Sequence, residues 1–232
     1  MFRRKQRIEI ELDAEELRAA AEAGDEIYLV EVDEDGNEIE PETEDEAAVG
    51  HGPWDADELP AALAEIERAD LGSLLIPAPE GKEVRLQVDE RSGDIAAVLI
   101  AGPDGALELK AFAAPRHGDL WTDVLPQLRA DVAQRGGTTA ERDGLWGREL
   151  LCQLQVQMPD GQPGVQPSRI IGINGPRWLL RATFLGQPAV DPQQAVEWEQ
   201  LLAGVVVRRG DTAMPQGEAL PLALPPDARR VE

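Results

Sequence analysis

Four arginines are the residues whose type and spacing point most directly to chemistry. Arg177 and Arg181 are four positions apart in the largely apolar segment 177–185, so an extended strand would project both from one face. Arg169 lies in the segment expected to pair with that strand, and Arg116 would join them if the helix that follows it begins at the same end of the sheet. Guanidinium groups placed together bind carboxylate or phosphate groups through paired hydrogen bonds. These four residues are our candidate binding site for a small anion; the alternative is that they pair with acidic side chains of the protein itself.

The other reactive side chains give weaker signals. Cys152 lies in a segment of alternating apolar and polar residues, so we expect it in the core, far in sequence from either histidine. His117, beside Arg116 before an expected helix, is interpreted as part of a surface loop, with an anion site at the helix start as the alternative. Trp146, in the loop GLWGRE, is the tryptophan that we expect to be exposed and to contact a partner. The sequence contains no signature of a nucleotide-binding loop, a serine hydrolase or a zinc protease. We therefore expect no catalytic residue, no metal site and no cofactor.

The chain of 232 residues is strongly acidic, with 45 Asp and Glu against 22 Lys and Arg. Residues 1–60 carry 21 of these acidic and 5 of the basic residues, so most of the net charge of −23 belongs to the N-terminal quarter. This excess argues against direct binding to nucleic-acid phosphates, which needs clustered Lys and Arg. The single cysteine excludes a disulfide framework, and no apolar run approaches the roughly 20 residues of a membrane span. We expect a cytoplasmic protein that does not contact membranes.

Residues 1–40 have the pattern of a small, acidic strand–helix–strand element. Its first segment alternates isoleucine and leucine with glutamate, as a strand with one polar face does, and Asp13 is placed to cap the helix that follows. An element of this size buries too little apolar surface to be stable alone. We therefore expect residues 8–40 to dock on the main domain, on a second copy of the chain or on a partner protein. The segment 41–52 is interpreted as a solvated acidic linker.

Residues 53–214 have the pattern of a main α+β domain, and the Pro-rich segment 215–232 that of an extended tail. Turn residues separate most of the alternating segments, which predicts a sheet of antiparallel strands. Asn174–Gly175 is the strongest hairpin signal of the chain. The expected elements are a short helix over 57–68, strands within 71–79, 83–90, 95–102 and 106–112, a helix over 119–135 with a kink or an irregular turn at Pro126, strands within 138–143, 148–158, 168–173 and 177–185, and a final helix from Asp191.

Five stretches carry a resemblance to a known family: GPWD (52–55), DLGSLLIPAPEG (70–81), LELKAFAAPRHGDLW (107–121), GINGPRWLLRATFLG (172–186) and VVVRRGDTAMP (205–215). In their order and spacing they resemble an actinobacterial family catalogued as domain-of-unknown-function family 3710, over about residues 50–225. The resemblance implies a cytoplasmic actinobacterial protein and assigns no activity. The order of the expected elements is also similar to the PsbP/DcrB-type α–β sandwich, in which a mostly antiparallel sheet is covered by helices and serves binding or assembly. This sandwich is the fold that we expect.

Three functions follow as hypotheses. The first is a non-enzymatic protein-binding or assembly module, with residues 8–40 as the contact to a protein partner or to a second copy. The alternative is an enzyme or sensor that binds a small anionic metabolite through the arginine-lined face. The third is mimicry of nucleic acid by the acidic N-terminal segment, which would require carboxylates at phosphate-like spacing on an ordered surface.

Overall fold

The computed structural model describes residues 52–89, 92–157 and 162–224. The element expected at 8–40, almost all of the linker expected at 41–52 and the end of the tail lie outside these residues. The predictions made for those segments therefore stay predictions.

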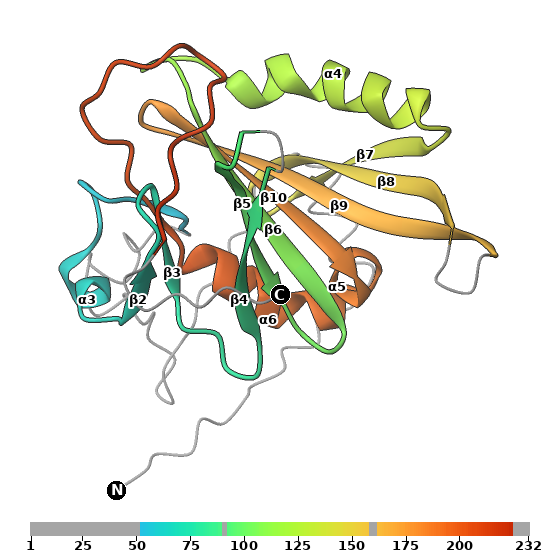
Figure 1. The fold of residues 1–232 in the computed structure, drawn as a ribbon, viewed down its shortest axis with the longest axis horizontal. Helices are drawn as coiled ribbons and strands as arrows, with labels where there is room; N and C mark the ends of the chain where they lie inside the picture. The colour runs from blue at the N-terminus through green and yellow to red at the C-terminus, as the bar shows by residue number, and fades with distance from the viewer. Residues whose placement is uncertain (1–51, 90–91, 158–161, 225–232) are drawn as a thin grey trace, which may run out of the picture. The chain divides into compact units, whose positions relative to one another are not determined.

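Seven antiparallel strands form the main sheet of the described chain, in the order β4–β5–β6–β10–β9–β8–β7 (Figure 1). Burial alternates residue by residue along β6, as its alternating sequence predicts for a strand with one face on the core. The expected meander and the expected edge strand β7 are confirmed. The strands are β4 (Glu83–Val88), β5 (Ile95–Ala101), β6 (Gly105–Ala113), β7 (Thr138–Gly144), β8 (Gly147–Gln157), β9 (Pro163–Gly175) and β10 (Trp178–Gly186).

A second, smaller sheet has the order β1–β11–β3–β2, and its β1 pairs with β11 in parallel. Its strands are β1 (Trp54–Asp55), β2 (Arg68–Asp70), β3 (Leu74–Pro77) and β11 (Val206–Val207). The prediction of a helix over 57–68 is wrong in its length, because only α3 (Ala61–Ala64) is helical. None of the residues of α3 is buried. Arg68 instead begins β2, which pairs with β3.

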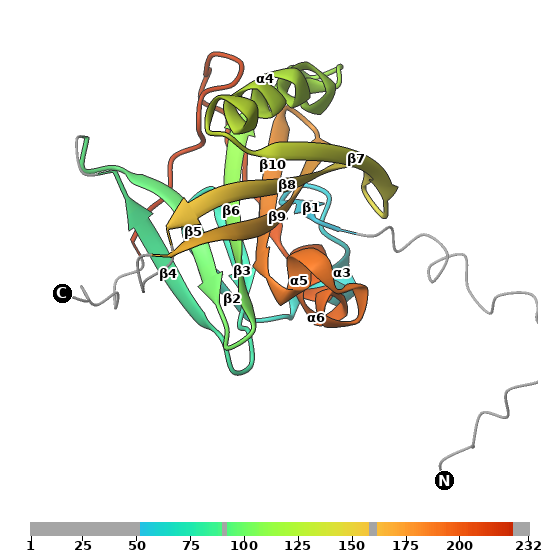
Figure 2. The same cartoon turned by 90° about the vertical axis from the view of Figure 1, so that its right-hand side faces the viewer.

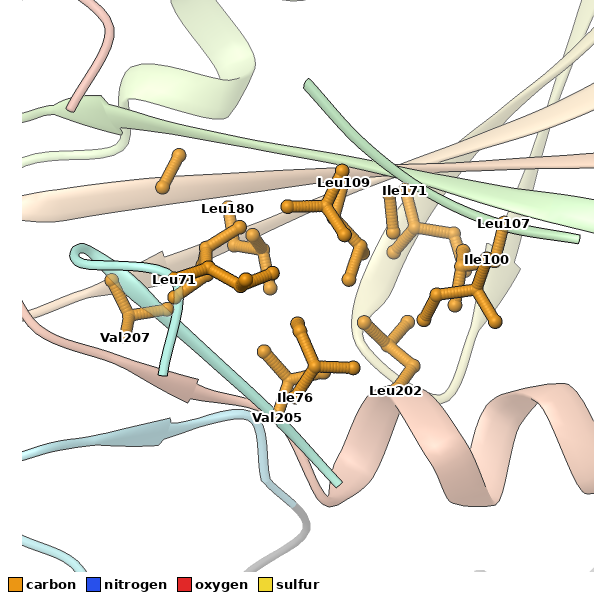
Figure 3. Close-up of a cluster of buried hydrophobic side chains, with 14 of the residues drawn as sticks. Leu71, Ile76, Ile100, Leu107, Leu109, Ile171, Leu180, Leu202, Val205 and Val207 are labelled. Atoms are coloured by element: carbon orange, nitrogen blue, oxygen red, sulfur yellow. The ribbon is translucent and has the colours of Figure 1, made fainter. Parts of the chain in front are cut away.

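The main core lies between one face of the seven-stranded sheet and a layer made of the small sheet and α6 (Pro192–Ala203). In Figure 3, Leu202 of α6 points toward Leu107 and Ile171 of the sheet, and all three side chains are fully buried. The short helix α5 (Gln187–Val190) precedes α6. Asp191 caps α6 by accepting a hydrogen bond from the backbone of Gln193, with a proline at the first helical position, as the sequence predicts.

The opposite face of the sheet carries one helix of the described chain, α4 (Leu120–Gln134), which runs through Pro126 (Figures 1 and 2). Trp121 and Leu125 of α4 pack against Leu150 and Leu179 of the strands. Helices therefore cover the sheet only in part. The described chain is an α+β domain built on a mainly antiparallel sheet.

The described part of the tail runs extended and touches both sheets. Ala219 forms a bridge with Phe112 of β6, and Leu222 forms one with Gly72 beside the small sheet. Leu220 between them is buried, and its backbone N–H donates to Ala111 O at 2.8 Å. None of the helices in this part of the chain is long and apolar enough to cross a membrane.

Candidate functional site

The turn between β9 and β10 is the first part of the site. The sequence predicts this turn at Asn174–Gly175, but it lies two residues later, because Gly175 pairs with Trp178 across the hairpin. Proline has no backbone N–H group that could be left without a partner, and its φ is fixed. Both properties suit Pro176 to the first position of the turn. A Cβ on Gly175 would lie 2.1 Å from the ring of Trp178, so glycine is needed there for packing. Arg177 takes the second turn position with φ 62°, and it is the one non-glycine residue of the described chain with a positive φ.

The side chain of Asn174 ties this turn to the start of α4. Its Oδ1 accepts a hydrogen bond from the backbone N of Trp121 at 3.3 Å, and its Nδ2 donates to Asp119 Oδ1 at 2.7 Å. Asp119 caps α4, accepting from the hydroxyl and the backbone N of Thr122. These hydrogen bonds hold the pKa of Asp119 below its usual value, and the one from the Thr122 hydroxyl has the largest effect. The loop that carries Arg116 is thus anchored at its helix end.

A third segment, the turn after β1, is anchored by Asp55. Its carboxylate is buried and accepts from Trp178 Nε1 at 2.6 Å through Oδ2 and from the backbone N of Asp57 at 2.9 Å through Oδ1. Both oxygens therefore have partners inside the protein. The side chains of Asp57 and Glu58 are exposed at this turn.

These three segments line an open cleft of about 550 Å³, within the range of small-molecule pockets. Arg116 and Arg177 share the cleft with Asp57 and Glu58, and none of the four forms an ion pair with another described residue. The Arg177 side chain has one contact at the limit of a hydrogen bond, 3.5 Å from Nη2 to Gly210 O. The cleft is lined by Asp55, Asp57, Glu58, Arg116, His117, Asn174, Gly175, Pro176 and Arg177.

The other two predicted arginines, Arg169 and Arg181, do not reach this cleft. In the register of the hairpin Arg169 is opposite Phe184, whereas Arg181 is opposite Gly172, so the two arginines lie on opposite faces of the sheet. The four arginines therefore do not form one binding face. This corrects the expectation of a shared pocket, because side chains alternate between the two faces along a strand.

Arg169 follows the alternative interpretation, in which the arginines pair with acidic residues of the protein. It is 3% exposed, and its Nε and Nη2 each donate to Glu149 at 2.7 Å. Its Nη1 donates to Glu199 of α6 at 2.5 Å. Glu149 is fully buried and also accepts from Arg142 Nε at 3.0 Å. We call Arg142, Glu149, Arg169 and Glu199 the buried ion network.

Trp146 does not have the exposure expected of a contact residue. Its indole is half-buried against the main core, and Nε1 donates to Gly52 O at 2.6 Å. Leu145 beside it is an exposed apolar residue of this loop. Cys152 is buried as expected, and burial raises the pKa of its thiol.

The sequence interpretation missed the acidic side of the cleft, formed by Asp57 and Glu58, and the anchoring roles of Asp55 and Asn174. A signal was available, because three of the stretches that carry the family resemblance supply most of the lining: GPWD, the PRH of the third stretch and NGPR of the fourth. The described residues contain no group of three or more His, Cys, Asp and Glu placed to hold a metal ion.

The fold and the cleft together define an α+β domain with a mixed-charge site beside the β9–β10 turn. The chain belongs to the family described as protein of unknown function (DUF3710), whose model matches residues 52–231. This match confirms the resemblance found in the sequence.

No curated protein matches the chain. A crystal structure from Bacteroides thetaiotaomicron VPI-5482 is 14% identical, with a TM-score of 0.37, over 63% of this chain and 49% of that one. The chain thus spans about half the length of that protein. The solution structure of PsbP (CyanoP) from Synechocystis sp. PCC 6803 is 15% identical, with a TM-score of 0.35, over 60% of this chain and 91% of that one. Likenesses this distant carry no argument about function.

Proposed function

We propose that the protein is a non-enzymatic binding module whose cleft holds a charged segment of a partner protein. One observation carries the proposal: Arg116 and Arg177 share a cleft with Asp57 and Glu58, and all four lack an ion-pair partner among the described residues. Buried charges are normally paired, as in the buried ion network, whereas exposed charges often are not; what distinguishes these four is that they line one cleft. Unpaired charges of both signs in one cleft fit a ligand that supplies both partners.

The mixed charge favours a peptide over a small anionic metabolite. An anion would be attracted by the two guanidinium groups but repelled by Asp57 and Glu58 a short distance away. A peptide with one acidic and one basic side chain can satisfy both sets of groups. Arginine also holds a carboxylate through two parallel hydrogen bonds, which fixes the orientation of the bound segment.

The backbone of Arg177 supports the same proposal. A left-handed conformation costs a non-glycine residue about 1–2 kcal/mol, and glycine adopts it freely. The Arg177 carbonyl accepts from Ala114 N at 2.9 Å and from Arg209 Nε at 3.2 Å, so the neighbouring elements fix this conformation. Strained residues of this kind concentrate at ligand-binding positions.

Several expectations stay part of the proposal. They are the cytoplasmic location, the actinobacterial origin, the PsbP/DcrB-type arrangement of the layers, and a partner or self-contact through residues 8–40. Nucleic-acid mimicry rests on the acidic segment outside the described residues and is not needed for the role proposed for the cleft.

Titration with synthetic octapeptides tests the proposal. One peptide carries two Glu and two Lys among Gly and Ser, and two matched peptides carry only the Glu pair or only the Lys pair. The indole N–H resonance of Trp178 reports on the cleft, because this group donates to Asp55 in the lining. We expect a saturable shift with the mixed peptide that is lost in Arg116→Gln and Arg177→Gln.

The matched control is Arg135→Gln. Arg135 is exposed after the last turn of α4, and its side chain has no partner among the described residues. This variant removes the same charge and should bind the mixed peptide as the wild type does. Equal binding of the Glu-only peptide would favour the small-anion alternative, and no shift with any peptide would refute the proposal.

A further inference from the structure

A second group of charges, outside the cleft, lies on the face of the main sheet that carries α4. Arg181 of β10 is directly opposite Lys110 of β6, and Thr183 is opposite Glu108. Residues opposite each other in an antiparallel pair share a face, so these four side chains project together. Leu179, two residues before Arg181 on the same face, packs in the apolar cluster beneath α4. The charged group therefore borders the part of the face that α4 covers.

The group has more positive than negative charge. Glu108 Oε1 lies 3.2 Å from Lys110 Nζ and 4.0 Å from Arg181 Nη2, so two cations share one carboxylate. The side chains of Lys110, Glu108 and Arg181 are 25%, 20% and 21% exposed. Partly buried charges are less screened by solvent than exposed ones, so the excess of one positive charge creates a local field even in an acidic protein.

The guanidinium group of Arg181 is held in place while its N–H donors make no hydrogen bond to another described residue. Its Cζ lies 5.4 Å from the centre of the Phe112 ring. No hydrogen bond from this group reaches another described residue, and the contact with Glu108 is at the distance limit of an ion pair. Burial lowers the pKa of Arg181, with Glu108 acting in the opposite direction, which means that the charged form is incompletely compensated.

On the β9 side, Arg181 adjoins Gly172, where a Cβ would lie 2.0 Å from the ring of Trp121. The Trp121 ring therefore occupies the space above Gly172. Lys110 flanks Arg181 on the β6 side, and the Thr183 hydroxyl lies on the same face roughly 7 Å along the strand. The hydrogen-bond donors of Arg181, Lys110 and Thr183 thus lie over one region of the sheet surface.

We propose that Lys110 and Arg181 form an oxyanion-binding site that takes a carboxylate or a phosphate group. Arg181 supplies paired N–H donors, Lys110 supplies the second positive charge, and Thr183 adds a hydroxyl donor. Glu108 competes with the ligand for both cations, so it lowers the affinity of the site. The site is separate from the cleft, since none of its residues lines the cleft.

The test is an NMR titration of the full chain with sodium phosphate and, separately, with sodium glutarate, at an ionic strength held constant with NaCl. The backbone amides of Lys110 and Thr183 are the reporters. We expect a saturable shift at both amides with at least one of the two anions. Saturation with phosphate alone identifies a phosphate ligand, saturation with glutarate alone a carboxylate ligand, and saturation with both the shared chemistry.

Three variants decide the outcome. Arg181→Gln should weaken binding at least tenfold, and the exposed control Arg135→Gln should leave it unchanged. Glu108→Gln should tighten binding, roughly fivefold, because it removes the competing carboxylate. A gain of affinity cannot result from misfolding, so this variant separates a binding site from an ordinary ion pair. Shifts that fail to saturate with either anion, or a weaker affinity in Glu108→Gln, would overturn the proposal.

Discussion

Replacing Glu149 by Gln should strongly destabilise the domain. Glu149 is fully buried and accepts hydrogen bonds from Arg169 at 2.7 Å twice and from Arg142 at 3.0 Å. The amide keeps the shape but removes the charge, so Arg169, itself 3% exposed, is left with Glu199 as its one carboxylate among the described residues. Breaking a buried pair from one side costs about 3–5 kcal/mol, a large share of the 5–15 kcal/mol that holds a typical domain together.

The assay is urea unfolding followed by tryptophan fluorescence, with a thermal melt in parallel. A loss of 3–5 kcal/mol corresponds to a decrease in Tm of roughly 6–20 °C for a domain of this size. The matched control is Glu141→Gln. Glu141 pairs with Arg129 at 2.8 Å and with Arg148 at 3.6 Å, but its side chain is 30% exposed. An exposed pair contributes at most about 1 kcal/mol, so this variant should be nearly neutral.

A double variant distinguishes charge from shape at the same place. Glu149→Leu with Arg169→Met removes both buried charges, so it should lose less stability than Glu149→Gln alone, because no unpaired charge remains between these two positions. The reasoning is refuted if Glu149→Gln loses less than about 1 kcal/mol, or if the double variant is the less stable of the two.

Three further predictions concern single residues. Arg177→Gly should leave the domain as stable as the wild type or up to about 1 kcal/mol more stable in urea unfolding, because it relieves the positive φ, and it should abolish peptide binding; a clear destabilisation would contradict the strain argument. Asp119→Ala should cost about 1 kcal/mol at neutral pH through loss of the helix cap. The folded-state pKa of Asp119 is lowered, so its carboxylate contributes stability above the unfolded-state pKa of about 3.9. This contribution is lost as the pH falls through the folded-state pKa. The Tm values of wild type and variant should therefore converge in acid. Cys152 is buried with a raised pKa, so a thiol reagent should react with it in urea and not in the native protein; rapid native labelling would contradict its burial.

The elements that the sequence predicts well are those with local signals. Asp119 before α4 and Asp191 before α6 are caps within three residues of the groups that they bond, so the helix starts follow from neighbouring residues. The strands of the meander are separated by turn residues and follow for the same reason. Burial of Cys152 also follows, since alternation alone places it inside.

The cleft depends on contacts between distant segments, and these have no local signal. Asp55 bonds Trp178, 123 residues away, and Asn174 bonds Asp119, 55 residues away. The turn at Pro176 was missed because Asn174–Gly175 has the stronger hairpin pattern, although packing against Trp178 and α4 requires both residues inside β9. Such requirements arise only once the tertiary structure is known.

The separation of Arg169 from Arg181 was, by contrast, within reach of the sequence. Moving the turn from 174–175 to 176–177 shifts the pairing by four residues, and an even shift keeps every side chain on its face. Either turn therefore places Arg169 opposite an apolar residue of the core face. Counting residues through the hairpin would have excluded a pocket that contains both arginines.

The parallel pairing of β1 with β11 has a consequence for how the chain is made. Trp54 pairs with Val206, so the small sheet joins a segment made early in the synthesis of the domain to one that is made late. Leu74 and Ile76 of β3 pack beside β11 and remain without that neighbour until residues 206–207 have been added. Contacts between such distant segments form slowly, and the exposed strand is open to aggregation in the meantime. We therefore expect the domain to complete its core only once residues 206–207 have been synthesised and are free to pair, and nascent chains halted before residue 205 to need chaperone protection.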